Sequence, residues 1–83
     1  MRYADSNCRF EKVYAPEEAY RIVGPCVVTG KEYTVYVPAA ELFAYRQGRL
    51  IRSALPSVSD DDREFLISGL SPEGWRRTFE GGE

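Results

Sequence analysis

Three consecutive carboxylates at residues 60–62, followed by Arg63 and Glu64, form the densest cluster of chemically useful side chains in the sequence. Such a cluster can hold Mg²⁺ or Ca²⁺, imitate nucleic-acid phosphates, or start a helix. A metal loop spaces its ligands alternately, whereas consecutive helical residues point in different directions. Acids in a first turn are favoured by the helix dipole, and Ser59 can cap the helix with Asp62 at the capping-box position. We therefore predict a helix start without a metal site, whose acids form a candidate binding patch: Asp60, Asp61, Asp62 and Glu64.

A second candidate patch combines arginines that recur every three residues with two tyrosines of a predicted strand: Arg46, Arg49, Arg52, Tyr33 and Tyr36. A continuous helix would align the arginines so that they clamp phosphates or an acidic protein surface. Gly48 is expected to interrupt that helix, so the alternative is that the arginines are simply solvated. The two tyrosines fall on opposite faces of one strand and cannot both be core. Tyrosine and arginine are enriched at protein interfaces.

Catalytic chemistry has little support in the sequence. Histidine is absent, which removes the usual Ser–His and Cys–His pairs. Cys26 lies among Pro25, Val27 and Val28 and is typical of a small buried hydrophobe rather than an activated thiolate. No glycine-rich phosphate loop is present. We expect no catalytic residue, no cofactor and no enzymatic activity.

The composition indicates one small globular domain. Of the 83 residues, 43% are hydrophobic and 13% aromatic, which is too rich for a disordered chain and sufficient for one modest core. The net charge of −2 provides no overall basic field for a nucleic acid. Residues 38–53 carry three arginines against Glu41, whereas residues 54–83 carry three arginines against seven acids. We therefore expect two oppositely charged surfaces.

Two β-rich runs predict a hairpin. Residues 27–29 and 32–37 flank a Gly30-Lys31 pair, which fits a two-residue turn with glycine at positive φ. Alternate residues of the second run should form its buried face: Tyr33, Val35 and Val37. Gly24-Pro25 is expected to separate residues 20–23 from 26–29 by a bulge or bend. Residues 9–14 can supply a third strand at the sheet edge.

After Pro38 the sequence changes to a helical pattern. Pro38 and Gly48 can start and stop one helix, residues 49–56 can form a second, and Gly69 can stop the helix that begins at the acids. Ser71 is a suitable cap for a last helix, on which Trp75 and Phe79 share a face. The apolar sides that we expect to be buried comprise Ala39, Leu42, Phe43, Tyr45, Leu50, Ile51, Leu55, Phe65, Leu66 and Leu70.

The predicted fold class is α+β, with a small antiparallel sheet in the N-terminal half and three or four short helices in the C-terminal half. One domain should span residues 1–83, with residues 9–37 β-rich, 38–79 helical and 80–83 a frayed tail. The polar opening of the chain and the lack of a long apolar run favour a cytoplasmic location without membrane contact. In that compartment Cys8 and Cys26 should be reduced thiols.

Four segments together carry a resemblance to a known group of proteins: "CVVTGKEYTVYVP", "YRQGRLIRSALPSVS", "DREFLISG" and "SPEGWRRTF". Their succession resembles small proteins encoded by bacteriophages and other mobile elements, which have no established activity. The pattern covers about residues 26–79. In that group an acid commonly follows the tryptophan and a glutamine follows Leu-Ile, where this chain has Arg76 and Arg52. These arginines put a shared partner in doubt.

The leading hypothesis is a non-enzymatic phage-type protein that binds and blocks a host protein in the bacterial cytoplasm. Small acidic phage proteins without catalytic residues resemble inhibitors of nucleic-acid-handling defence complexes, including anti-CRISPR proteins that act on a CRISPR effector. One alternative is a small nucleic-acid-binding or regulatory protein that uses the arginine ridge. A further alternative is an assembly accessory protein, and both a monomer and a homodimer paired through the sheet edge remain open.

Overall fold

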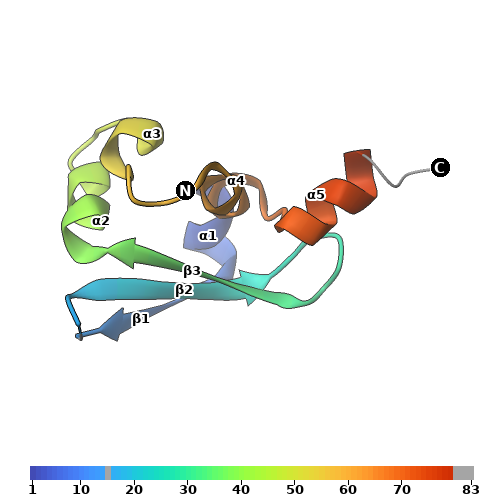
Figure 1. Cartoon of the computed structure of the whole chain (residues 1–83), viewed down its shortest axis with the longest axis horizontal. Helices are drawn as coiled ribbons and strands as arrows, with labels where there is room; N and C mark the ends of the chain where they lie inside the picture. The colour runs from blue at the N-terminus through green and yellow to red at the C-terminus, as the bar shows by residue number, and fades with distance from the viewer. Residues whose placement is uncertain (15, 80–83) are drawn as a thin grey trace.

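The computed structural model describes residues 1–14 and 16–79 and places a helical layer over one face of a three-stranded sheet (Figure 1). The α+β class is confirmed. The strands pair antiparallel in the order β1-β2-β3. The elements in chain order are α1 (Arg2–Asn7), β1 (Arg9–Val13), β2 (Ala19–Pro25), β3 (Glu32–Pro38), α2 (Ala39–Arg46), α3 (Ile51–Ala54), α4 (Asp60–Ser68) and α5 (Pro72–Phe79). The predicted frayed tail, residues 80–83, lies outside the described residues.

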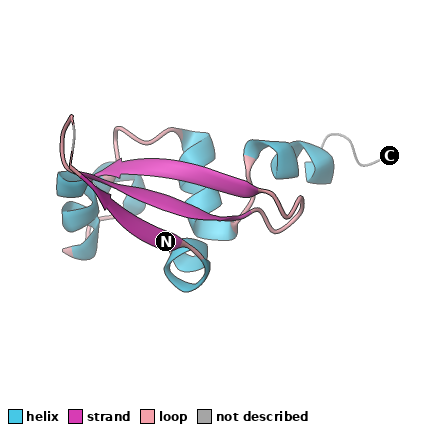
Figure 2. Ribbon diagram, turned by 90° about the horizontal axis from the view of Figure 1, so that it is seen from below, coloured by secondary structure: helices cyan, strands magenta, loops and turns pink. Residues whose placement is uncertain are grey.

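The sheet buries one face and leaves the other open. Phe10, Ile22 and Val35 are aligned across the three strands, and Ile22, Val35 and Val37 are fully buried beneath the helices. This confirms the predicted buried face of β3, because side chains alternate along a strand. β1 lies at the edge of the sheet, as predicted. Figure 2 shows the sheet from its open face, with helices behind it.

The predicted two-residue turn is wrong, although the hairpin itself is present. β2 ends at Pro25, and a six-residue connection, residues 26–31, leads to β3. Gly30 has the predicted positive φ, of 74°. Val27 does not extend the strand because its N–H donates to the Gly69 carbonyl, at 2.9 Å. The connection is therefore anchored to the end of α4 instead of forming a tight turn.

The expected break at Gly24 is also wrong, because β2 runs through it without interruption. Gly24 pairs with Tyr33 in the ladder. A Cβ atom at this position would lie 2.5 Å from the Cys8 Sγ and 3.2 Å from the Asn7 carbonyl oxygen. Glycine is therefore required by the close approach of the Asn7–Cys8 segment rather than by a bend.

The helices after β3 lie where the sequence predicts them, but the second, predicted at residues 49–56, is only Ile51–Ala54, and two apolar side chains that were expected to be buried are exposed. Gly48, with a φ of 107°, follows α2 and separates it from α3. Leu50 was expected to be buried but is 79% exposed, since it precedes α3 with an extended backbone and points away from that helix's packed side. Phe43 was also expected to be buried but is 64% exposed, because it lies beside Leu42 on the rim of a groove between α2 and β1.

α4 is the helix that holds the two layers together. Ser59 caps it, with its side-chain oxygen accepting the Asp62 N–H at 3.1 Å, and Gly69 ends it in the left-handed region. Phe65 is fully buried. Its ring centroid lies 5.7 Å from that of Tyr3 and 5.0 Å from that of Tyr33. The predicted start and stop of this helix and the burial of Phe65 and Leu66 are confirmed, whereas Leu70, which follows the helix, is only partly buried.

α1 is an element that the sequence does not indicate. It has six residues and no side-chain cap, so it is too short to be stable alone. Tertiary contacts stabilise it: Ala4 is fully buried, Tyr3 packs on Phe65, and Asp5 accepts two hydrogen bonds from Arg46. None of the helices in the described part of the chain is long and apolar enough to span a bilayer.

Two glycines at positive φ provide a matched test of packing at the end of α4. A Cβ on Gly69 would lie 2.8 Å from both the Tyr3 ring and the Val27 side chain, whereas one on Gly30 would have no neighbour within 4 Å. Gly30→Ala should cost about 1–2 kcal/mol of unfolding free energy from backbone strain alone. Gly69→Ala should cost at least about 1 kcal/mol more because of overpacking. Equal losses in urea unfolding would contradict this contact.

Candidate functional site

The acidic run is divided by the fold into engaged and outward-facing carboxylates. The Asp62 carboxylate accepts the Tyr33 hydroxyl at 2.5 Å. Asp60 pairs with Arg63, one turn along the same helix. The capping box is therefore only half formed: Ser59 caps the helix, but Asp62 binds the sheet. Two members of the predicted patch, Asp61 and Glu64, are left to face outward.

Asp61 and Glu64 lie beside Trp75, one member of an exposed aromatic pair on α5. Together with Leu70 and Trp75 they line a small recess between α4 and α5. Trp75 is 42% and Phe79 60% exposed, and their ring centroids are 4.4 Å apart. We call these five residues the α4–α5 surface: Asp61, Glu64, Leu70, Trp75 and Phe79. It offers an apolar centre with a carboxylate rim.

The aromatic half of this surface is a functional candidate that sequence reasoning missed. The shared face of Trp75 and Phe79 was recognised in the sequence, but as a helix face without an assigned binding role. α5 extends past the end of the sheet (Figure 1), so its aromatic side has little of the core to pack against. The signal available in the sequence was the composition of this helix. Its two aromatic residues are surrounded by charged ones, Glu73, Arg76 and Arg77.

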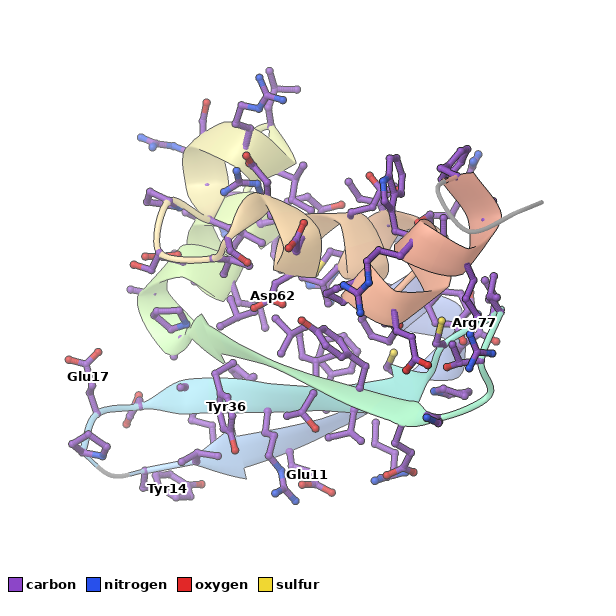
Figure 3. The ribbon with its side chains drawn as sticks, turned by 45° about the vertical axis from the view of Figure 1, so that its right-hand side comes forward. Glu11, Tyr14, Glu17, Tyr36, Asp62 and Arg77 are labelled. Atoms are coloured by element: carbon purple, nitrogen blue, oxygen red, sulfur yellow. The ribbon has the colours of Figure 1, made fainter. Side chains whose placement is uncertain are left out.

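Tyr33 and Tyr36 are divided between the two faces of β3, as predicted. Tyr33 is half-buried. Its pKa is raised mainly by burial and secondly by the adjacent Asp62 carboxylate, so the side chain keeps its proton and donates it in the hydrogen bond. Tyr36 is 58% exposed. Figure 3 shows Tyr36 and Glu11 on the side of the sheet away from Asp62. Tyr33 is thus a structural link, and only Tyr36 is available to a partner.

The open face around Tyr36 is polar and internally neutralised. Arg21 donates to Glu11, which also pairs with Arg9 at 3.6 Å, and Arg9 pairs with Glu32 at 3.2 Å. The hydrogen bond from Arg21 holds the pKa of the Glu11 carboxyl below its ordinary value. A face whose charges are already paired offers little net electrostatic attraction to a partner.

The arginines do not form one continuous ridge. Arg46 donates to both Asp5 oxygens, at 2.8 and 3.1 Å, and this contact lowers the pKa of the Asp5 carboxyl. Gly48 then interrupts the helix, as expected. Arg49 lies on a separate recess of about 410 Å³ with Leu50 and Ile67. Arg49 and Arg52 form no ion pair with any residue in the described ranges.

The start of α5 is joined to the β2–β3 connection by Cys26. This thiol is 2% exposed, as the sequence predicts, and its Sγ accepts the Ser71 N–H at 3.4 Å. Burial raises the pKa of the Cys26 thiol, but hydrogen bonds from the Ser71 hydroxyl and from backbone groups outweigh it and lower the pKa to about 6. A Cβ on Gly74 would lie 2.5 Å from this sulfur. Cys26 is therefore a polar anchor and not the inert hydrophobe that was expected.

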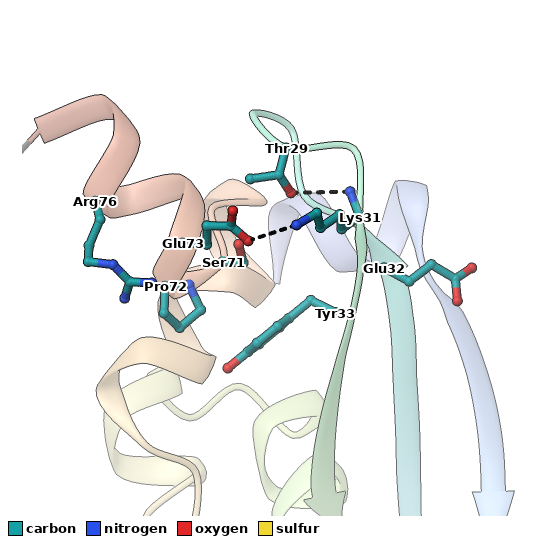
Figure 4. Close-up of a pocket in the computed structure, with 8 residues that line it drawn as sticks. All are labelled: Thr29, Lys31, Glu32, Tyr33, Ser71, Pro72, Glu73 and Arg76. Atoms are coloured by element: carbon teal, nitrogen blue, oxygen red, sulfur yellow. Dashed lines mark hydrogen bonds and ion pairs between the residues drawn. The ribbon is translucent and has the colours of Figure 1, made fainter. Parts of the chain in front are cut away.

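A pocket of about 280 Å³ lies above this junction (Figure 4). Its cations and anions are intermixed: Lys31 pairs with Glu73 at 3.6 Å, while Glu32 and Arg76 line the wall. Such a mixture favours neither a phosphate nor a metal. Within residues 1–14 and 16–79, no three potential metal ligands come together.

No protein-family model, curated protein or solved structure matches the chain. Function is therefore argued from the geometry of its own surfaces. The α4–α5 surface is the best supported of these, because it joins exposed aromatic rings to carboxylates that no other described group neutralises.

The hydrogen bond from Tyr33 to Asp62 can be tested with a matched pair of variants. Tyr33→Phe should lower the unfolding free energy by roughly 1–2 kcal/mol, because it removes a half-buried hydrogen bond to a carboxylate. Tyr36→Phe removes the same hydroxyl from the exposed face and should change stability by less than about 0.5 kcal/mol. In an Asp62→Ala background the effect of Tyr33→Phe should shrink. An undiminished loss there would show that another partner stabilises Tyr33.

The Cys26 anchor makes stability depend on pH. A pKa lowered from the ordinary value of 9.0 to about 6 means that folding favours the thiolate, so its contribution is complete above pH 9.0 and is lost as pH falls through about 6. The thiolate absorbance at ~240 nm should rise with a midpoint near pH 6 in the folded protein. This rise should be missing in Cys26→Ser. Wild-type stability should rise from pH 6 to 9 relative to that variant. A midpoint at or above 9 would show that Cys26 stays neutral.

Proposed function

We propose that this protein is a non-enzymatic binder that attaches to a basic protein surface through the α4–α5 surface. The observation that carries the proposal is that Asp61 and Glu64 of α4 line one recess together with the exposed Trp75 of α5. Tryptophan is the residue type most enriched at the energetic centre of interfaces. Carboxylates at the rim steer a positively charged partner and exclude others.

The partner that fits this surface is a nucleic-acid-handling protein. Such proteins carry positively charged grooves for phosphate backbones, and an acidic helix start can occupy such a groove in place of nucleic acid. The resemblance to small phage and mobile-element proteins supports a host defence complex, such as a CRISPR effector, as the target class. Inhibition would then follow from occupancy of the groove.

A second candidate function rests on the unpaired arginines. Arg49 and Arg52 are exposed beside Leu50, which is 79% exposed. Arginines that lack an ion-pair partner in the described structure can contact phosphates, in a manner that is sensitive to salt and indifferent to sequence. This arrangement supports direct nucleic-acid binding as the alternative.

The two functions are separated by a pull-down of the tagged protein from bacterial lysate, with and without nuclease. We expect one stoichiometric protein that survives nuclease. Trp75→Ala should weaken its binding by about 2 kcal/mol, roughly 30-fold, because the ring occupies the centre of the surface. The Asp61→Asn/Glu64→Gln double variant should weaken binding and flatten its dependence on salt.

Glu17→Gln/Glu18→Gln is the matched control, because it removes the same two charges from another part of the chain. Figure 3 shows Glu17 at the end of the molecule opposite Arg77 of α5. Circular dichroism checks that each variant is folded. If both double variants weakened binding equally, the effect would come from the net charge of the protein, and this result would contradict a local site. Recovery of nucleic acid that is lost with Arg49→Ala/Arg52→Ala would replace the proposal with the second candidate.

A further inference from the structure

The outer edge of β1 is a second candidate surface, distinct from the α4–α5 surface. Within the described residues, β1 has β2 on one side and no strand on the other. An edge strand presents unpaired backbone N–H and C=O groups and is a template for pairing with another chain. Natural proteins block such edges with charges, prolines or covering segments.

The register shows which backbone groups of β1 face outward. At the ends of the β2–β3 ladder, Ala39 N–H donates to Glu18 and Cys26 N–H donates to Lys31. Even-numbered residues of β2 therefore bond to β3, and odd-numbered ones bond to β1. Since Glu11 is aligned with Arg21, the odd-numbered residues of β1 are used inside the sheet. The backbone groups of Phe10 and Lys12 are left facing outward.

Lys12 is the residue that would normally protect this edge, but it folds back onto its own molecule. Its Nζ lies 5.1 Å from the centre of the Tyr20 ring and 3.9 Å from a Glu18 carboxylate oxygen. A lysine held in this way does not project past the strand as a charged block.

An apolar groove adjoins the same edge on the helix side of the sheet. It has a volume of about 710 Å³ and lies between β1, β2 and α2, where Phe10, Tyr20, Leu42 and Phe43 contribute its apolar walls. Phe43 is 64% exposed there. If a strand were added to β1, every second side chain of that strand would point to the face of the sheet on which the groove lies.

The charges of β1 discriminate among the registers in which two copies could pair, although Arg9 and Glu11 also pair with each other, with Glu32 and with Arg21 inside one copy. Two copies of β1 that pair antiparallel through the outward groups of Phe10 and Lys12 are related by a two-fold axis that passes through one residue position. If that position is Arg9, Glu11 or Lys12, the residue faces its own copy and like charges are opposed. Centring on Phe10 instead places Arg9 opposite Glu11 of the other copy, twice by symmetry. Opposite charges across a strand pair stabilise it, and like charges destabilise it. The same register brings the two Phe10 rings together beside the grooves.

We propose that two copies of this chain pair through β1, antiparallel and centred on Phe10, so that their three-stranded sheets become continuous. The interface consists of the outward backbone groups of Phe10, the Lys12 N–H facing the Cys8 carbonyl of the other copy, two Arg9–Glu11 pairs on the open face and the Phe10 side chains on the groove side. The Cys8 N–H takes no part, because it donates to the Ala4 carbonyl. A two-fold interface of this kind is isologous, since each residue meets its counterpart in the other copy. The α4–α5 surface takes no part in it.

Charge reversal tests the register. Sedimentation equilibrium of the full chain should show a dimer whose dissociation constant rises about tenfold or more in Arg9→Glu and in Glu11→Arg, because each change makes both cross-strand pairs repulsive. A mixture of these two variants should form a heterodimer. One chain then carries acids at positions 9 and 11 and the other carries arginines at both, so each cross-strand pair again joins opposite charges. This recovery cannot be explained by variants that fail to fold.

Proline substitution tests the edge. Lys12→Pro removes an outward N–H of β1 and should abolish the dimer, whereas Thr34→Pro makes the matched change on the outer edge of β3 and should leave it intact. A wild-type chain that stays monomeric over the concentration range would overturn the proposal. Loss of the dimer in Thr34→Pro alone would transfer the interface to β3, and a mixture of the charge variants that does not associate would refute the register.

Discussion

The burial of Phe65 is the interaction on which the rest of the structure depends. Its ring lies between Tyr3 of α1 and Tyr33 of β3, so one side chain joins the chain start, the sheet and the main helix. Leu66 beside it is also fully buried. A chain of 83 residues can build only one modest core, and each element that lacks stability of its own is positioned by contact with this centre.

That core also determines which charged groups remain available to a partner. Packing Tyr33 under α4 brings its hydroxyl to Asp62, and the helix geometry brings Arg63 to Asp60. Arg46 of α2 is likewise engaged by Asp5 of α1. The candidate surfaces are therefore what is left after the fold has used its charges: Asp61 and Glu64 on one side, Arg49 and Arg52 on another. Binding specificity would arise from this selection rather than from the number of charges.

Local signals in the sequence were sufficient for much of the fold. Ser59, Gly69 and Ser71 act within one helical turn, and the alternation of Tyr33, Val35 and Val37 is a property of one strand, so these features were predicted correctly. Apart from the unexpected exposure of Leu50 and Phe43, the failures involve distant partners. Val27 leaves the sheet to bond with Gly69, Gly24 is required by Cys8, and α1 is stabilised by α4. In the candidate site, the acids were found from their spacing, but their division by Tyr33 and the exposure of Trp75 depend on tertiary placement.

The packing of α1 on α4 has a consequence for the order in which the protein can form during synthesis. The helix Arg2–Asn7 is synthesised before α4, so its packing on Phe65 can form only after residues 60–68 have followed. The three strands can pair before then, with Ile22 and Val35 still uncovered. A nascent chain in this state exposes an apolar sheet face to chaperones and to neighbouring chains.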